Sequence, residues 1–155
     1  TGHWPRRCQV QLSGREIQIM RILFDTNIIL DIALKRPPFF TDASEAFKSV
    51  DQQNVFGYIS ATSITDIYYV ARKSIGHDTS ILFIEDLLDI LDVVGIDRSV
   101  IKHALQLNFR DFEDAIQSVS AKLNDIDYVI TRNISDFTES EVTAITPGAF
   151  LKKLL

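Results

Sequence analysis

The sequence predicts an α/β protein in which helices cover both faces of a central parallel sheet. Short apolar runs recur along the chain, and they lack the polar alternation of half-exposed strands, which is typical of buried parallel strands. Longer segments with helical spacing of their apolar residues separate these runs. Because parallel strands need crossover connections, this alternation predicts right-handed strand-helix-strand units.

The composition indicates one soluble domain and limits the kinds of partner. The 155 residues, 46% of them hydrophobic, suit a single domain with a full core, and no apolar run approaches the roughly 20 residues that span a bilayer. The single cysteine, Cys8, has no partner for a disulfide, which fits a reducing cytoplasm. A net charge of −5 is the wrong sign for holding nucleic acid by surface charge alone, so a polyanionic substrate would need a bound divalent metal.

The sequence is expected to consist of an extension, 1–19, and a folded domain, 20–155. The first segment has no long periodic pattern, and we interpret it as an extension, tag or leader. Residues 20–155 are expected to form the single domain, because Met20 directly precedes the first convincing strand. The apolar stretch of a secretory signal, roughly 7 to 15 residues, is not found.

The first strand, 22–24, and the turn that follows it carry the main functional signal. The strand ends at Asp25, and a carboxylate in that place lies at the carboxyl edge of the sheet, where open α/β folds bind ligands. Helical spacing starts after Thr26, so 25–27 is expected to form the turn from strand to helix. An alternative is that Asp25 merely caps that helix.

The remaining elements follow from breakers, caps and periodicity. Pro37 and Pro38 interrupt the first helix pattern, and Gly76 is expected to end a helix over 62–75. Asp78 or Thr79 offers the N-cap of the next helix. Further helices are expected at about 41–50, after Asp97, at 112–123 and from Pro147, and further strands at 55–60, 93–94, 128–130 and 142–145.

Acidic and polar side chains also cluster in 60–66, 111–116 and 131–136, beside helix starts or strand ends. Carboxylates that converge from separate elements would suit a cation such as Mg²⁺, which prefers oxygen ligands. Periodicity alone does not place them in a site. At 100° per residue, Asp66 lies roughly 200° and Asp114 about 160° from the apolar stripe of its helix, which predicts solvent-facing charges.

Four segments together resemble the PIN domain family: Ile-Leu-Phe-Asp-Thr-Asn at 22–27, Thr-Ser-Ile-Thr-Asp at 62–66, Asp-Phe-Glu-Asp-Ala at 111–115, and Val-Ile-Thr-Arg-Asn at 129–133 with Asp136 and Phe137. They occur in the family's order within 20–155. The resemblance implies a three-layer α/β/α fold with a central parallel sheet. It also implies a metal-dependent ribonuclease, and many members are toxins of bacterial toxin-antitoxin pairs.

The resemblance assigns roles to individual residues. Asp25, Asp66 and Asp114 match the family's acidic ligands and would hold one or two Mg²⁺ or Mn²⁺ ions that activate water for attack on a phosphodiester, without a histidine base. Asn133 falls on the fourth position, where its amide carries no charge, and Asp136 is a possible substitute. The positions expected to support the site are Asn27, Ser63 and Thr131.

Two further features leave alternatives open. Arg132, beside the expected site, would either grip an RNA phosphate or form a salt bridge with an acidic residue. Phe39 with Phe40, and the apolar run 81–84, would either bury against a second copy or an antitoxin, or pack in the core.

Two other functions compete with the ribonuclease. The first is a catalytically weak or inactive PIN-like binding module, which the uncharged Asn133 keeps open. The second is a phosphotransfer domain, which also places an aspartate after its first strand. A haloacid-dehalogenase-type phosphatase would want a second aspartate where Asn27 stands, and a response-regulator receiver would want an acidic pair where 22–24 is apolar.

Overall fold

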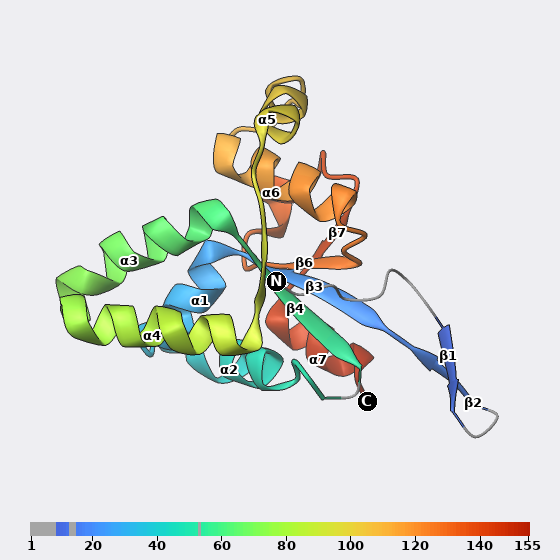
Figure 1. Ribbon diagram of the computed structural model, residues 1–155, viewed down its shortest axis with the longest axis horizontal. Helices are drawn as coiled ribbons and strands as arrows, with labels where there is room; N and C mark the ends of the chain where they lie inside the picture. Colours follow the sequence, from blue (N-terminus) through green and yellow to red (C-terminus); the bar gives the residue numbers. More distant parts are fainter. Residues whose placement is uncertain (1–8, 13–14, 53) are drawn as a thin grey trace.

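The computed structural model describes residues 9–12, 15–52 and 54–155 and is built around an all-parallel sheet (Figure 1). The strand order is β5-β4-β3-β6-β7, with β3 in the centre. The strands are β3 (Met20–Phe24), β4 (Val55–Ser60), β5 (Asp92–Val94), β6 (Tyr128–Ile130) and β7 (Thr143–Ile145). Every neighbouring pair in this sheet is parallel, as the alternation of strands and helices predicted.

Helices cover both faces of the sheet, which confirms the three-layer architecture. Ile22 and Phe24 of β3 are buried on one face, against helices α1, α2, α3, α4 and α7, whereas Leu23 is buried on the other face, towards α6. This two-sided burial explains why the strand is a continuous apolar run. The helices are α1 (Thr26–Ala33), α2 (Phe40–Lys48), α3 (Ala61–Ile75), α4 (His77–Ile90), α5 (Arg98–Leu105), α6 (Phe112–Leu123) and α7 (Pro147–Lys153), with a 3₁₀ turn η1 (Ile134–Phe137).

Most predicted boundaries are confirmed, and one cap is wrong. Helix α6 and strand β4 have the predicted limits, and α7 begins at Pro147. Gly76 ends α3 with a φ of 82°, a conformation that costs glycine little. It also serves as the N-cap of α4, so that helix begins at His77 and Asp78 lies in its first turn instead of capping it. A single glycine therefore turns the chain from α3 into α4, and no separate loop or cap is needed.

A hairpin that the sequence analysis did not predict precedes the sheet. Strands β1 (Gln9–Leu12) and β2 (Arg15–Gln18) pair antiparallel as a separate two-stranded sheet, next to the amino end of β3 (Figure 1). The other parts of the predicted extension, 1–8 and 13–14, lie outside the described residues. None of the helices in the described part of the chain has the length and apolarity to cross a membrane.

Candidate active site

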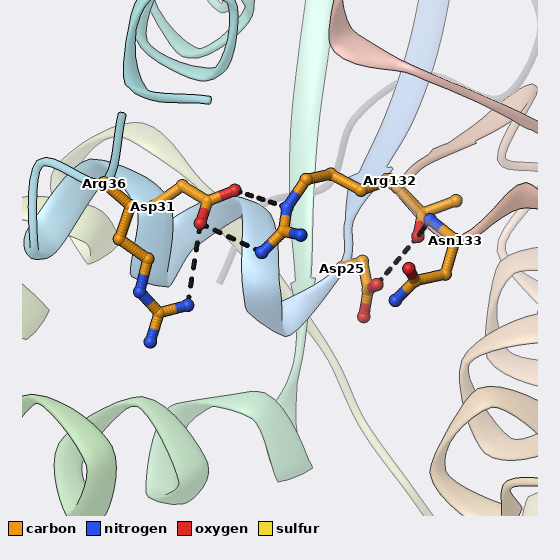
Figure 2. Close-up of polar contacts among 6 residues, drawn as sticks. Asp25, Asp31, Arg36, Arg132 and Asn133 are labelled. Carbon is orange, nitrogen blue, oxygen red and sulfur yellow. Dashed lines mark hydrogen bonds and ion pairs between the residues drawn. The ribbon is translucent and has the colours of Figure 1, made fainter. Parts of the chain in front are cut away.

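Asp25 lies where β3 ends, and its side chain is held in place from two directions. It occupies the N-cap position of α1 but makes no capping hydrogen bond. Instead, its Oδ1 accepts from Gln117 Nε2 at 3.0 Å and its Oδ2 accepts from Thr131 Oγ1 at 2.8 Å. The residue is only 4% exposed. The interpretation of Asp25 as a simple helix cap is therefore wrong, because its carboxylate binds side chains of other elements. Figure 2 shows it pointing towards the turn after β6.

The register of the sheet explains this convergence. Phe24 of β3 is paired with Ile130 of β6, so the residues that follow the two strands emerge side by side. The backbone N–H of Asp25 donates to Ile130 O at 3.0 Å, which fixes the two strand ends together. Thr131, predicted to support the site, comes next in the chain and is fully buried against Asp25.

Thr26 links three helices through its hydroxyl group. Its Oγ1 donates to Glu113 Oε1 at 2.8 Å and lies 2.7 Å from Ser63 Oγ, which leaves the Ser63 hydroxyl to donate to Thr26. Ser63, on the first turn of α3, is fully buried, and its predicted location beside the site agrees with the structure. Gln117 Nε2 also donates to Glu113 Oε1, at 3.2 Å, so one amide contacts carboxylates on two elements.

Glu113 connects Asp66 to this network. Burial raises the pKa of the Glu113 carboxyl to about 7, helped by a hydrogen bond to Asp66 and by repulsion from Asp66 and Asp25, while the Thr26 hydroxyl opposes the shift. Asp66 is half-buried. The structure therefore brings Asp66 to the same cluster as Asp25, with Glu113 between α3 and α1.

Asp114 belongs to the same cluster. Burial raises its pKa to about 7, and repulsion by Asp25, Asp111, Asp136 and Glu113 adds to the shift. Helical periodicity predicted that this side chain would face solvent, but it is half-buried. The reason is that 115–121, seven successive residues of α6, are all buried, so the face of α6 that carries Gln117 is turned into the protein towards Asp25.

The other predicted site residues lie around the turn after β6. Asn133 is exposed at the start of η1, and its backbone N–H donates to Thr131 Oγ1 at 3.1 Å. Asp136 lies within η1 and is half-buried, as is Asn27 in the first turn of α1. Arg132 forms an ion pair with Asp31, which is the salt-bridge alternative, although Asp31 was not among the predicted site residues.

Glu113 lies within one of the four motifs but had no predicted role, and Gln117 was not predicted. The two residues are four apart on α6 and so share one face of that helix. Asp25, which both approach, comes from a distant part of the chain. Their i, i+4 spacing is not distinctive, because Asp114 and Ser118 on the same helix share it, so the contact with Asp25 had to be read from the fold.

The donor set fits a divalent cation that keeps part of its water shell. Carboxylate oxygens are the ligands that Mg²⁺ prefers, usually one or two of them with several waters completing the octahedron. Within residues 9–12, 15–52 and 54–155, no group of three or more His, Cys, Asp or Glu side chains is already spaced to enclose an ion. Burial, and then repulsion by neighbouring carboxylates, raise the pKa values of Glu113 and Asp114, and a bound cation would relieve the repulsion.

A cavity of about 520 Å³ opens beside the acidic cluster. Asp136, whose charge helps to raise the pKa of Asp114, lines this cavity together with the exposed Arg110. The other lining residues are Asn108, Phe109, Ser135, Thr138 and Glu139. This polar opening lies between the segment before α6 and η1, and Asp136 is the residue that it shares with the acidic cluster.

Comparison with known families agrees with this geometry. The family model described as PIN domain matches residues 21–135, well over half of the chain. The chain belongs to the PIN domain family. This confirms the resemblance drawn from the four motifs, and the matched region includes Asp25, Asp66, Asp114 and Asn133.

The matches to individual proteins extend over nearly the whole length of those proteins. Ribonuclease VapC1 of Aquifex aeolicus (strain VF5) is 24% identical over 138 residues, which are 86% of this chain and 94% of the relative. A toxin-antitoxin complex from Klebsiella pneumoniae has a TM-score of 0.63 at 22% identity, covering 81% of this chain and 97% of that one. Mycobacterium tuberculosis VapC20, described as a sarcin-ricin loop cleaving toxin, has a TM-score of 0.63 at 13% identity, with coverage of 78% and 98%.

Proposed function

We propose that this protein is a metal-dependent endoribonuclease that hydrolyses RNA phosphodiester bonds, and that it is the toxin of a toxin-antitoxin pair. The observation that carries the proposal is the convergence of carboxylates from α1, α3, α6 and η1 on the carboxyl end of β3. The names of two similar proteins, a ribonuclease and a sarcin-ricin loop cleaving toxin, support this chemistry.

Asp25, Asp66 and Asp114 would hold one or two Mg²⁺ or Mn²⁺ ions, and we add Glu113 to this set. Asn133 and Asp136 complete the polar rim, with Asn27 beside Asp25 in the first turn of α1. A bound divalent ion supplies an activated water and stabilises the negative charge that develops on the phosphate. The protein's own contribution is orientation: Gln117 and Thr131 each donate to a different oxygen of Asp25, so its carboxylate cannot rotate freely.

The RNA strand would enter through the 520 Å³ cavity beside Asp136. Its lining carries amide, hydroxyl and guanidinium groups and the ring of Phe109, which suit the backbone and bases of a single strand, together with the carboxylates of Asp136 and Glu139, whose charge a bound metal would offset. Because the protein carries a net charge of −5, the bound metal must supply the attraction for phosphate that the surface lacks.

The decisive test is Asp25→Asn with cleavage of single-stranded RNA as the measurement. The wild type should cleave in the presence of Mg²⁺ or Mn²⁺ and stop when EDTA is added, and the variant should be inactive at every metal concentration. Asp89→Asn, at an exposed position on α4, is the matched control and should cleave like the wild type. Unchanged cleavage by purified Asp25→Asn would rule out this assignment.

The same assay decides the second candidate, a PIN-like binding module with little or no nuclease activity. The uncharged Asn133 is the observation that favours it, since a second metal would find a weaker ligand there. A folded wild-type protein that cleaves no RNA with either metal would support the binding module. Membership of the PIN domain family leaves the phosphotransfer alternative without support.

An antitoxin is the partner that we propose, in a cytoplasmic complex. One of the similar structures is a toxin-antitoxin complex. Apolar side chains on α3 and α4 remain exposed, including Tyr69 at 57% and Leu82 at 60%, and Phe39 is 40% exposed. Phe83, by contrast, packs against the core. Light scattering of the protein alone, and with the product of the neighbouring gene, separates a homodimer from an antitoxin complex.

A further inference from the structure

The guanidinium of Arg132 is committed to a partner outside the acidic cluster. Its Nε donates to Asp31 Oδ2 at 2.8 Å and its Nη2 donates to Asp31 Oδ1 at 3.2 Å, a two-pronged contact with a fully buried carboxylate (Figure 2). The Arg132 guanidinium carbon also lies 3.9 Å from the centre of the Phe39 ring. Arg36 completes the group, with Nη1 at 3.6 Å from Asp31 Oδ1.

This contact directs Arg132 away from the place where RNA would be cut. Arg132, Asp31 and Phe39 line a cavity of about 410 Å³. The 520 Å³ cavity next to the acidic cluster has a separate lining, to which Asp136 contributes. The guanidinium of Arg132 thus lies at a different opening from Asp136, although the Arg132 backbone is adjacent to Thr131.

Neighbouring residues of the turn after β6 hold the two ends of α1. Thr131 donates to Asp25 at the N-cap of that helix, and Arg132 donates to Asp31 in its last turn. The backbone of Arg36 also donates to Asp31 O at 3.0 Å, so the segment after the helix closes on the same residue. Two successive residues of one short turn thus contact both ends of α1.

We propose that Arg132 is a positioning residue and not an RNA contact: its ion pair with Asp31 fixes the turn that carries Thr131 and Asn133 against α1. Through Thr131, this pair sets the orientation of the Asp25 carboxylate. Through the bond from the Asn133 backbone to Thr131 Oγ1, it sets the start of η1 as well. The inference rests on the proposed ribonuclease function for its kinetic consequences, but the structural coupling can be measured without activity.

The test compares Arg132→Gln, Asp31→Asn, the double variant and Arg132→Lys. Arg36 stays beside Asp31 in Arg132→Gln, so the buried carboxylate keeps a cation and the variant should fold. Each single variant should lower kcat about tenfold to a hundredfold, with KM changed less than about twofold, because the site is misplaced while RNA contacts remain. The double variant should be no slower than either single one, since both remove one interaction.

Arg132→Lys distinguishes positioning from phosphate binding. Lysine keeps the charge but lacks the planar fork, so it should not restore kcat if the two-pronged contact with Asp31 is what matters. If Arg132 binds a phosphate instead, Arg132→Gln should raise KM and reduce the salt slope of RNA binding by about 0.7, Arg132→Lys should restore KM, and Asp31→Asn should leave kcat unchanged. That pattern would overturn the proposal. Arg98→Gln, an exposed arginine on α5, controls for loss of one surface charge.

Hydrogen-deuterium exchange of the amides in 131–137 provides the readout that does not depend on cleavage. Exchange should become faster in Arg132→Gln and in Asp31→Asn and stay at the wild-type rate in Arg98→Gln. If wild-type protein cleaves no RNA, the proposed function fails while this measurement still tests the positioning role. Unchanged exchange in both variants would refute the positioning role, whether or not the wild type cleaves RNA.

Discussion

Replacing Glu113 by glutamine should stabilise the metal-free protein, because the ionised Glu113 carboxylate destabilises the folded state. In the folded protein the Glu113 carboxyl is half-buried and faces Asp66 and Asp25, and its pKa rises from 4.5 to about 7. The amide of the variant keeps an oxygen that can accept from Thr26 Oγ1 and Gln117 Nε2, as the carboxylate does at 2.8 Å and 3.2 Å. The substitution therefore removes charge while retaining the hydrogen-bond acceptor.

The direction and size of the effect follow from the pKa of Glu113. Below pH 4.5 the carboxyl is protonated in both folded and unfolded chains and contributes no penalty. As the pH rises from 4.5 to about 7 the unfolded chain releases its proton first, so the folded state loses stability, and above pH 7 the penalty is complete. A wholly buried group shifted this far would cost about 3 kcal/mol, and solvent screening at half burial reduces the expected cost to about 1 kcal/mol.

Thermal unfolding in EDTA at pH 4 and pH 8 measures this difference. At pH 8, Glu113→Gln should melt about 2 to 4 °C above the wild type, and at pH 4 the two proteins should melt together. Glu85→Gln, at an exposed position on α4, should match the wild type at both pH values. A Glu113→Gln variant that is no more stable than the wild type at pH 8, or equally stabilised at both pH values, would refute the electrostatic account of the site.

Three further predictions concern the rest of the site and the sheet. Thr131→Val removes the donor to Asp25 and the acceptor for the Asn133 amide. Urea unfolding should show that the free energy of unfolding falls by about 1 to 3 kcal/mol, and a fall below about 0.5 kcal/mol would contradict a stabilising role for these hydrogen bonds. In the same assay, Gly57→Ala should lower the free energy of unfolding by about 1 to 3 kcal/mol, because the added Cβ would lie 2.6 Å from Leu91 Cδ2. Stability equal to the wild type would show that the neighbouring side chains move to accommodate the methyl group. Millimolar Mg²⁺ or Mn²⁺ should raise the melting temperature of the wild type and EDTA should reverse this, and a titration without any shift would count against an intact metal site.

The centre of the sheet was predictable because strands β3 and β4 are largely buried. The run 22–24 has no polar residue, since Ile22 and Phe24 pack against one helical layer and Leu23 against the other. Proline and glycine then marked boundaries by backbone geometry alone, as at Gly76 and Pro147. The β1-β2 hairpin was not predicted because 9–12 has only two alternating apolar residues, Val10 and Leu12, and 15–18 has only Ile17, which is too little for a strand pattern.

The site was predictable only in part, since periodicity describes one helix at a time. Asp114 lies opposite the apolar stripe of α6, which indicates solvent for a helix on a surface. In the fold, α6 is enclosed on several sides, and its polar face is turned towards Asp25 from a part of the chain about ninety residues away. The family resemblance supplied this placement where spacing could not. Neither helical periodicity nor the family resemblance indicated Gln117, whose role depends on a contact between distant segments.

The positions of two arginines explain why the acidic cluster around Asp25 is not neutralised by them. In the part of the chain that the structure describes, Arg36 and Arg132 are both drawn to Asp31, outside the cluster. Asp25 is instead oriented by the neutral donors Gln117 and Thr131, which fix the carboxylate without cancelling its charge. An arginine in place of either donor would satisfy the carboxylate and lower its affinity for a metal ion. Separating the structural ion pair from the acidic cluster thus lets one short helix, α1, be anchored firmly at one end while remaining available to a cation at the other.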